Sequence, residues 1–274
     1  MIRSSYLFGI LIIVLGMTFA CDLSKDIDIE LPTYEPEIVV ECYLQIGQPY
    51  TLLLTQSAPF FDPPNIPLLE GAIVTISHNG RTDTLRSGLF VNPNTDQVFN
   101  YVANVGPPSL EGVYDLEIIS AEGERLTAQT EIMPLIPIDE LEIVTREEDS
   151  LVAVLTRIPD PTDEANFYRR VFHLGGDILT ANIEQDFTAG DQFLEGESEL
   201  VFGTAFEYAP GDTLISTLYH ITEDYYDFLE SLETALNSNG NPFVQQESTR
   251  SNINGGIGIF TGFTLDRKMV IVPQ

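Results

Sequence analysis

Hydrophobic and polar residues alternate along much of the chain with the two-residue period of β-strands, in short runs separated by turn residues. One such run covers residues 72–77. The pair Asn79-Gly80 follows directly and is the strongest short signal for a tight hairpin turn. Residues 82–85 are therefore expected to form the return strand.

Similar runs, rich in Val, Leu, Tyr and Thr, fill most of the N-terminal half. They lie at residues 37–46, 50–56, 98–105, 112–119 and 125–132. About seven strands in about 100 residues, without a helical period, favour a β-sandwich of immunoglobulin-like size. The first predicted domain is this immunoglobulin-like β-sandwich, over residues 36–134.

Two prolines, Pro134 and Pro137, mark the expected domain boundary, because proline stops strand pairing and stiffens the chain. The second predicted domain, residues 135–274, is β-rich with one clear helix and is therefore α+β. Its extended runs lie at 138–146, 151–157, 165–174, 177–187, 200–208, 212–220 and 257–272. The chain as a whole is predicted to be mainly β.

The predicted helix covers residues near 222–237. Thr222 is a suitable N-cap, and two acidic residues follow it in the first turn, where the helix dipole favours negative charge. Ile221 and Tyr226 have the spacing of a hydrophobic staple. An apolar stripe expected to face the core is formed by Tyr225, Phe228, Leu229, Leu232 and Leu236.

Residues 1–20 have the layout of a signal peptide. Arg3 supplies the positive start, residues 6–19 are apolar, and small Ala20 precedes Cys21. This apolar run is shorter than the roughly 20 residues that span a bilayer. A cysteine directly after the cleavage point is typical of a bacterial lipoprotein, so we expect cleavage before Cys21 and lipidation of its thiol. The alternative is an ordinary signal peptide with an unmodified cysteine.

Polar residues and prolines between 21 and 35 predict a lipidated tether before the fold begins. A lysine and several acids just after Cys21 resemble the export tag of Bacteroidota lipoproteins that reach the outer face of the outer membrane. We therefore expect an outer-membrane protein held by its lipid anchor. Both a cell-surface and a periplasmic orientation stay open.

The charge balance is strongly acidic, with 12 Lys and Arg against 42 Asp and Glu and a net charge of −30. Such a chain repels phosphate, so a nucleic-acid partner is not expected. The carboxylates are either a solvated surface or a surface that collects cations. If Cys21 is lipidated, Cys42 is left without a disulfide partner; it is expected to be a buried, inert thiol rather than a reactive one.

Several short motifs together resemble a family of Bacteroidota lipoproteins, domain-of-unknown-function family 4249. The matching segments follow the lipidation motif and cover nearly the whole chain: residues 38–41, 112–116, 211–214, 241–243 and 251–260. The resemblance implies a cell-envelope lipoprotein, often encoded beside a TonB-dependent outer-membrane receptor. It implies no activity and supplies no catalytic residue.

The sequence holds no recognisable catalytic, metal or cofactor motif. His78, His173 and His220 are scattered without ligand spacing, and no nucleophile elbow or cysteine–histidine pairing is present. The glycines at 255, 256, 258 and 262 do not match a dinucleotide fingerprint. They are expected to allow close backbone approach at a turn and strand, with a ligand contact as the alternative.

Acidic loops and paired aromatics are weaker candidates. The loops at 146–149, 160–164 and 186–199 lack the calcium-loop pattern, so solvated loops are expected and a calcium site is the alternative. Phe60 and Phe61 are expected to pack against the sandwich, with an exposed recognition patch as the alternative.

Three functions fit these observations. The first is a non-enzymatic lipoprotein that captures a ligand for a TonB-dependent outer-membrane uptake system or accompanies that system. The second is a glycan-binding or glycan-processing surface module, which the absence of Trp disfavours. The third is a structural or adhesion lipoprotein. No cofactor is expected for any of them.

Overall fold

A computed structural model describes residues 35–58, 67–92, 95, 97–161, 165–192, 199–238 and 249–274. Residues 36–274 form one compact unit. The described chain is mainly β with one helix, as predicted. Its strands are β1 (Ile38–Leu44), β2 (Thr51–Gln56), β3 (Ile73–His78), β4 (Arg81–Val91), β5 (Val98–Val102), β6 (Tyr114–Ile119), β7 (Arg125–Thr130), β8 (Glu140–Thr145), β9 (Val152–Pro159), β10 (Phe167–Leu174), β11 (Asn182–Gly190), β12 (Glu199–Gly203), β13 (Thr213–Ile221), β14 (Ile257–Gly262) and β15 (Thr264–Ile271).

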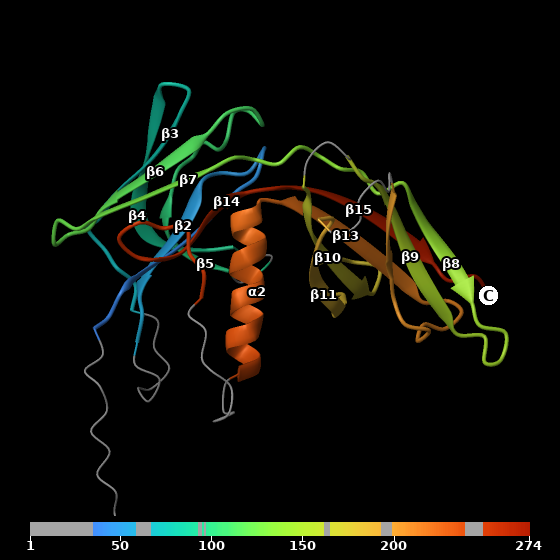
Figure 1. Cartoon of the computed structure of the whole chain (residues 1–274). Coiled ribbons are helices and arrows are strands. Elements are labelled where there is room, and N and C mark those ends of the chain that lie inside the picture. Colours follow the sequence, from blue (N-terminus) through green and yellow to red (C-terminus); the bar gives the residue numbers. More distant parts are fainter. Residues whose placement is uncertain are drawn as a thin grey trace, which may run out of the picture. The chain divides into compact units, whose positions relative to one another are not determined.

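The largest sheet has eight strands in the order β14-β1-β2-β5-β4-β3-β6-β7 (Figure 1). The long strand β4 belongs to both halves of it, because residues 81–85 pair with β3 and residues 86–91 pair with β5. A register shift between Ser87 and Phe90 separates the two pairings. A bulge of this kind bends a strand and lets one sheet fold over a core.

Alternating side chains from both halves of this sheet fill a single core. β1 shows the pattern plainly, because residues 38, 40, 42 and 44 are buried and the residues between them are only half-buried. Leu52 of β2 and Tyr101 of β5 meet Val74 of β3 and Leu116 of β6 in the same cluster. Cys42 also lies in this core as a free, fully buried thiol, and burial raises its pKa far above the ordinary value.

β14 places C-terminal residues in the N-terminal sheet. It runs parallel to β1, with Val40 opposite Gly258, and bridges on its other side join Thr127 to Asn254 and Ile132 to Gly262. β14 therefore lies between β1 and the end of β7 and nearly closes the sheet. The predicted domain boundary after residue 134 stays a prediction, and one strand from beyond it completes the first sheet.

The remaining described strands form two smaller sheets. One has four strands in the order β11-β10-β13-β15, and the other has three in the order β12-β9-β8. Among the described residues, one apolar cluster of this region contains Tyr168, Ile158 and Leu218, and another contains Phe172 and Val154. A third joins Phe167 and Ile221 to α2 and β14. Residues 257–272, predicted as one extended run, form two strands in different sheets, and the chain changes sheet at Phe263.

The helix α2 (Glu223–Ser238) begins at the predicted N-cap. The Tyr225 backbone N–H donates to the Thr222 hydroxyl at 3.3 Å. Tyr225 and Phe228 are buried, whereas Leu232 and Leu236 at the far end of the predicted stripe are exposed. Only the first half of the stripe therefore contributes to the core. None of the described helical residues forms a segment long and apolar enough to cross a bilayer.

Candidate functional site

A hollow with aromatic walls has a volume of about 680 Å³. β1, β5, β10, β13, β15 and the first turn of α2 all contribute to its lining. Tyr43, Phe99, Tyr219, Tyr225 and Phe263 supply the aromatic rings. Its volume falls within the range of about 300–1,000 Å³ that is common for small-molecule sites. We call it the aromatic cavity.

The rings of the aromatic cavity pack on one another at ordinary aromatic distances. The centroids of Tyr43 and Tyr225 lie 5.7 Å apart, and those of Tyr225 and Phe263 lie 6.4 Å apart. Tyr219 meets Phe263 edge-on at 5.4 Å. These contacts between protein side chains hold the rings of Tyr43, Tyr219, Tyr225 and Phe263 in place, so this part of the wall is preformed.

One guanidinium is fixed at this wall. Arg169 donates to the two oxygens of the Asp186 carboxylate at 2.8 and 2.6 Å, and its third nitrogen donates to the Tyr225 hydroxyl at 3.2 Å. Its Cζ lies 5.8 Å from the centroid of Tyr219. The bidentate pair sets the plane of the guanidinium, and the ring contact adds a cation–π attraction.

The surroundings of Arg169, Tyr43 and Tyr225 all raise the pKa of these groups. The hydrogen bond to Asp186 raises the pKa of Arg169, so it stays cationic. Burial raises the pKa of Tyr43, with the nearby Tyr225 and Glu41 adding to the effect. Burial also raises the pKa of Tyr225, against the opposing charge of Arg169. The cavity thus offers ring faces, the guanidinium groups of Arg169 and Arg267, the Glu41 carboxylate and the protonated hydroxyl groups of Tyr43 and Tyr225.

Strand alternation explains how these side chains reach the cavity. In β1 the even-numbered residues fill the core, which turns Glu41 and Tyr43 to the opposite face. In β10 the side chain of Arg169 lies on the opposite face of the strand from those of its buried neighbours, Tyr168 and Arg170. None of these residues stands out in the sequence as a site, because each is an ordinary member of a strand or helix pattern.

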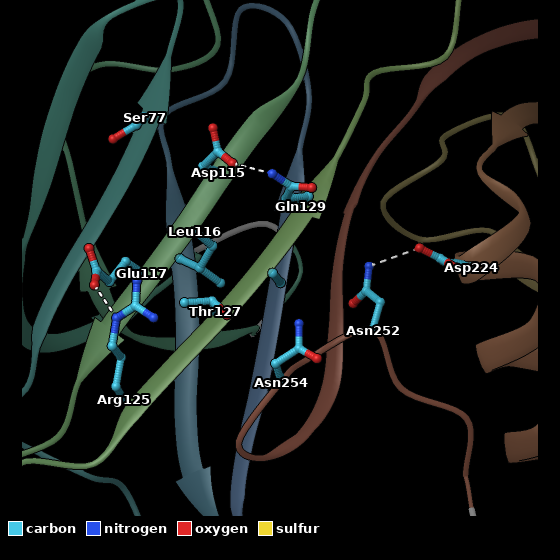
Figure 2. A pocket seen from close by; sticks show the side chains of 11 residues that line it. Ser77, Asp115, Leu116, Glu117, Arg125, Thr127, Gln129, Asp224, Asn252 and Asn254 are labelled. Carbon is cyan, nitrogen blue, oxygen red and sulfur yellow. Dashed lines mark hydrogen bonds and ion pairs between the residues drawn. The ribbon is translucent and has the colours of Figure 1, made fainter.

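A second hollow, of about 520 Å³, lies on the outer side of β6 and β7 (Figure 2). Its polar side chains already bind one another. Arg125 pairs with Glu117 at 2.6 Å, and Gln129 donates to Asp115 at 2.6 Å. Asn252 uses its amide to bridge to Phe260, donating to the carbonyl at 2.8 Å and accepting from the N–H at 3.0 Å. This hollow has no aromatic wall, so we favour the aromatic cavity as the site.

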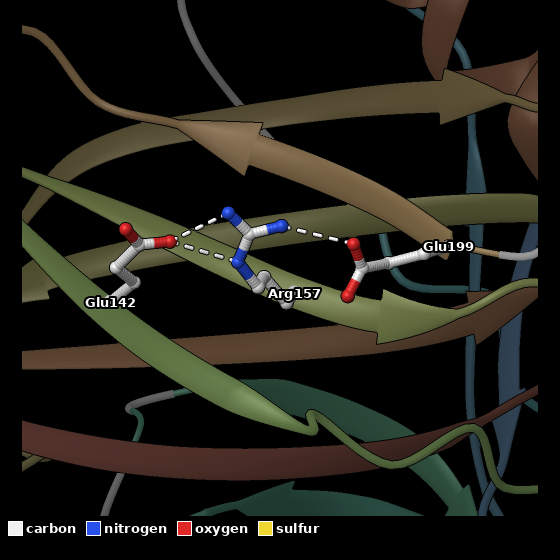
Figure 3. Close-up of polar contacts among 3 residues, drawn as sticks. All are labelled: Glu142, Arg157 and Glu199. Atoms are coloured by element: carbon white, nitrogen blue, oxygen red, sulfur yellow. Dashed lines mark hydrogen bonds and ion pairs between the residues drawn. The ribbon is translucent and has the colours of Figure 1, made fainter.

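An ion triad joins the three strands of the smallest sheet (Figure 3). Arg157 of β9 reaches Glu142 of β8 at 2.6 Å and Glu199 of β12 at 2.9 Å. All three side chains are partly open to solvent, so we interpret the triad as a surface ion-pair network that links the three strands and not as a ligand site.

The three histidines lie in strands and are buried. Nδ1 of His78 is 3.1 Å from the Val113 carbonyl, and Nδ1 of His220 is 2.8 Å from the Pro134 carbonyl. Within the described ranges, no group of three or more His, Cys, Asp or Glu residues could hold a metal ion.

The structure brings two of the predicted acidic loops together. Asp160 and Asp191 are both buried beside Asn166, whose N–H and amide donate to the two Asp191 oxygens at 2.9 and 2.8 Å. The Tyr168 hydroxyl donates to Asp160 at 3.0 Å. Burial raises the pKa of Asp160; the Tyr168 hydrogen bond opposes that rise, and the charge of Asp191 adds to it. The sequence showed two separate clusters and gave no sign that they meet.

The glycines at 255, 256, 258 and 262 serve close backbone approach, as predicted. A Cβ at Gly256 would lie 2.6 Å from the Ile38 carbonyl oxygen, and one at Gly262 would lie 2.6 Å from the Glu131 carbonyl oxygen. Cys21, Phe60 and Phe61 lie outside the described residues. Their predicted roles stay predictions.

Three comparisons place the chain among known proteins. The model of the family described as "Domain of unknown function (DUF4249)" matches residues 24–269. A comparison with curated proteins gives no significant match. A solved DUF4785 family protein from Legionella pneumophila is similar at 13% identity and a TM-score of 0.25, over 66% of this chain and 52% of that chain. The chain thus spans about half of that structure, and a likeness this weak carries no argument about function.

Proposed function

Because the chain belongs to the DUF4249 family, whose sequence model covers residues 24–269, we propose a function that needs a ligand site but no catalytic centre. The protein is a lipid-anchored lipoprotein of the bacterial outer membrane, in a member of the Bacteroidota. It captures a small ligand as a non-enzymatic component of a TonB-dependent uptake system. The aromatic cavity is its ligand site.

The observation that carries this proposal is the preformed wall of the aromatic cavity. Tyr219, Tyr225 and Phe263 are held by one another, and Arg169 is held by Asp186. A ligand would therefore meet groups that need little further ordering, which lowers the entropic cost of binding. Ring faces and a fixed cation suit a ligand with flat apolar surfaces and electronegative groups.

The anchor rests on the signal-peptide pattern that ends at Cys21. The compact unit begins at Pro36, directly after the predicted tether of residues 21–35. A tether of this length would separate the cavity from the bilayer and leave it accessible to a membrane partner.

The uptake partner is tested by cross-linking in intact envelopes, followed by purification of the lipoprotein and identification of its neighbours. The proposal predicts that a TonB-dependent receptor is enriched over a control lipoprotein expressed at the same level. Recovery of no outer-membrane transporter under conditions that capture other envelope neighbours would contradict it.

A second candidate, a glycan-binding module, is favoured by the composition of the same cavity. Tyr219 lines the cavity together with the amide side chains of Gln45 and Gln97, and rings and amides suit sugar faces and hydroxyl groups. The test is binding to an oligosaccharide array by the wild type, by Tyr219→Ala and by Phe206→Ala, an aromatic outside the cavity. If the cavity binds glycans, Tyr219→Ala loses the binding seen for the wild type and Phe206→Ala keeps it. An array on which the wild type binds nothing excludes the glycans tested.

A further inference from the structure

Arg267 of β15 lines both the aromatic cavity and a neighbouring hollow of about 400 Å³. The loop that follows β10 borders the same two hollows, with Leu179 at the aromatic cavity and Ile178 at the neighbouring one. Ile215 and Met269 supply further apolar side chains to the second hollow. Arg267 therefore places a cation between the aromatic rings and these aliphatic side chains.

The register of the four-stranded sheet sets the order of side chains along this face. Tyr219 of β13 lies opposite Arg169 of β10 and Leu265 of β15. Two residues along the same strands, Thr217 lies opposite Arg267. Residues two apart in a strand share a face and lie about 7 Å apart. The ring of Tyr219 and the guanidinium of Arg267 thus belong to neighbouring rows of one face.

The Arg267 guanidinium is oriented by the protein and is still open to a ligand. Its Nε donates to the hydroxyl of the fully buried Thr217 at 2.8 Å. Within the described residues, no carboxylate lies at ion-pair distance from Arg267, and its two terminal nitrogens form no hydrogen bond. Burial lowers the pKa of His173, and the charge of Arg267 lowers it further, so this charge acts on the next row of the face.

An arginine without a carboxylate partner is unexpected in a chain with 42 acidic residues. Arg169, the other arginine of the aromatic cavity, already binds both oxygens of Asp186. Five further arginines also form ion pairs with described carboxylates: Arg81, Arg125, Arg146, Arg157 and Arg250. Arg267 thus leaves its positive charge uncompensated at a cavity of suitable size for a ligand, which favours a ligand with a negative group.

We infer that the aromatic cavity takes an aromatic monocarboxylate, with its ring against Tyr219 and its carboxylate on Arg267. The planar fork of a guanidinium matches the two oxygens of a carboxylate, and the tyrosine ring offers a face for stacking. The row spacing of the sheet sets a separation of about 7 Å between the ring and the carboxylate. The inference rests on the proposed function, because it names the class of ligand for the proposed site.

Other carboxylates at these hollows limit the ligand to a single negative charge. Glu41 lies at the ring end of the cavity, where its Oε2 accepts a hydrogen bond from the Tyr43 hydroxyl at 3.4 Å. Asp177 lines the second hollow, and its Oδ1 accepts from the Leu179 N–H at 3.0 Å. Both carboxylates and the net charge of −30 repel a second anionic group.

Isothermal titration calorimetry of the full-length protein compares 4-phenylbutyrate with 4-phenylbutyramide, which lacks the charge, and with butyrate, which lacks the ring. The wild type is expected to bind the aromatic acid about tenfold more tightly than the amide, and to bind butyrate more weakly than the aromatic acid. Arg267→Gln is expected to bind the aromatic acid and the amide equally, with an affinity for the amide within about twofold of the wild type. Arg86→Gln removes an arginine that does not line the cavity and is expected to keep the preference of the wild type.

Equal affinities of the wild type for the aromatic acid and the amide would overturn the inference, as would an unchanged preference in Arg267→Gln. If the two bind equally and Tyr219→Ala loses both, the cavity is a ligand site and only the anionic class is wrong. Absence of binding by all three compounds also overturns the inference, whereas the cross-linking experiment tests the receptor partner separately. If Arg267→Gln does not fold, a wild-type crystal soaked with a brominated 4-phenylbutyrate decides the question. Its carboxylate is expected on Arg267, and a carboxylate placed elsewhere contradicts the inference.

Discussion

Gly258 of β14 packs directly on the main chain of β1: a Cβ at residue 258 would lie 2.0 Å from the carbonyl oxygen of Val40. Its φ of +120° is also a conformation that residues with a Cβ rarely adopt. Gly258 therefore has both a steric and a conformational reason to be glycine. The contact brings a C-terminal strand into the first sheet, and the strand after it carries Leu265 and Arg267 to the aromatic cavity.

Gly258→Ala is expected to destabilise the fold by about 3 kcal/mol or more, because β14 would have to leave its pairing with β1. For a chain of this size the loss corresponds to a Tm lower by roughly 6–12 °C. The matched control is Gly123→Ala, where φ is +91° but no atom lies within 4 Å of the added Cβ. Its cost is expected to be about 1 kcal/mol. Equal costs in thermal unfolding would show that the close approach to Val40 is not what requires glycine.

Tyr114 ties the start of β6 to the preceding loop. Its hydroxyl donates to the Ser109 carbonyl at 2.6 Å and accepts from the Ser109 N–H at 3.3 Å, while the ring is fully buried. Tyr114→Phe leaves both backbone groups without this partner and is expected to cost about 1–3 kcal/mol. Tyr226→Phe is the control, because Tyr226 is only half-buried near the start of α2 and the loss of its hydroxyl should change the free energy of unfolding by less than about 0.5 kcal/mol. Denaturant unfolding of both variants measures the difference, and similar midpoints would contradict this role of Tyr114.

Asp160 gives the protein a component of stability that falls as the pH rises. Its pKa is raised in the folded state, so the folded chain holds this proton more tightly than the unfolded chain does. The cost of the charged carboxylate is therefore absent below the unfolded pKa of about 4, grows through the folded pKa and is complete above it. Asp160→Asn should raise the Tm at pH 7–8, and this gain should vanish towards pH 4.

The control for Asp160 is Asp149→Asn, because the hydrogen bond from Arg146 lowers the pKa of Asp149. The sign is then reversed, so any stabilisation by Asp149 is present above pH 4 and lost below it. Thermal melts from about pH 2.5 to 8 at constant ionic strength compare the two variants. A pH dependence of the same sign in both would contradict the assignment to Asp160.

The lipid anchor is tested at Cys21. Cys21→Ser removes the thiol that would carry the diacylglycerol, so the variant is expected to leave the membrane fraction and to incorporate no labelled palmitate. Cys42→Ser provides the control, because that buried thiol cannot be the attachment point in the folded protein. If Cys21→Ser stays membrane-bound and is still labelled, the lipoprotein proposal is wrong.

Local features of the fold could be predicted from the sequence, because they depend on neighbouring residues. The Asn79-Gly80 hairpin forms with φ values of 48° and 79°, the left-handed pair that such a turn requires. The Thr222 N-cap likewise depends on one side chain and the turn that follows it. Residue spacing alone contains this information.

Long-range features could not be predicted in the same way. The alternation of residues 257–272 continues across Phe263, so nothing local shows that the chain changes sheet there. The aromatic cavity depends on the same kind of pairing, since Tyr43 and Tyr225 meet only when β1 and α2 are brought together. A single sequence records the pattern of each strand but not its partner.

The most direct test of the ligand site uses the absence of Trp from the chain. Leu179→Trp places a single fluorophore at the aromatic cavity, where Leu179 is 56% exposed, and Leu236→Trp places one on the exposed end of α2, away from it. Both variants are titrated with an oligosaccharide panel and with size-fractionated envelope extract. We predict a saturable change in fluorescence for Leu179→Trp and none for Leu236→Trp. Equal responses from both variants, or no response from either to any fraction, would contradict ligand capture in the aromatic cavity.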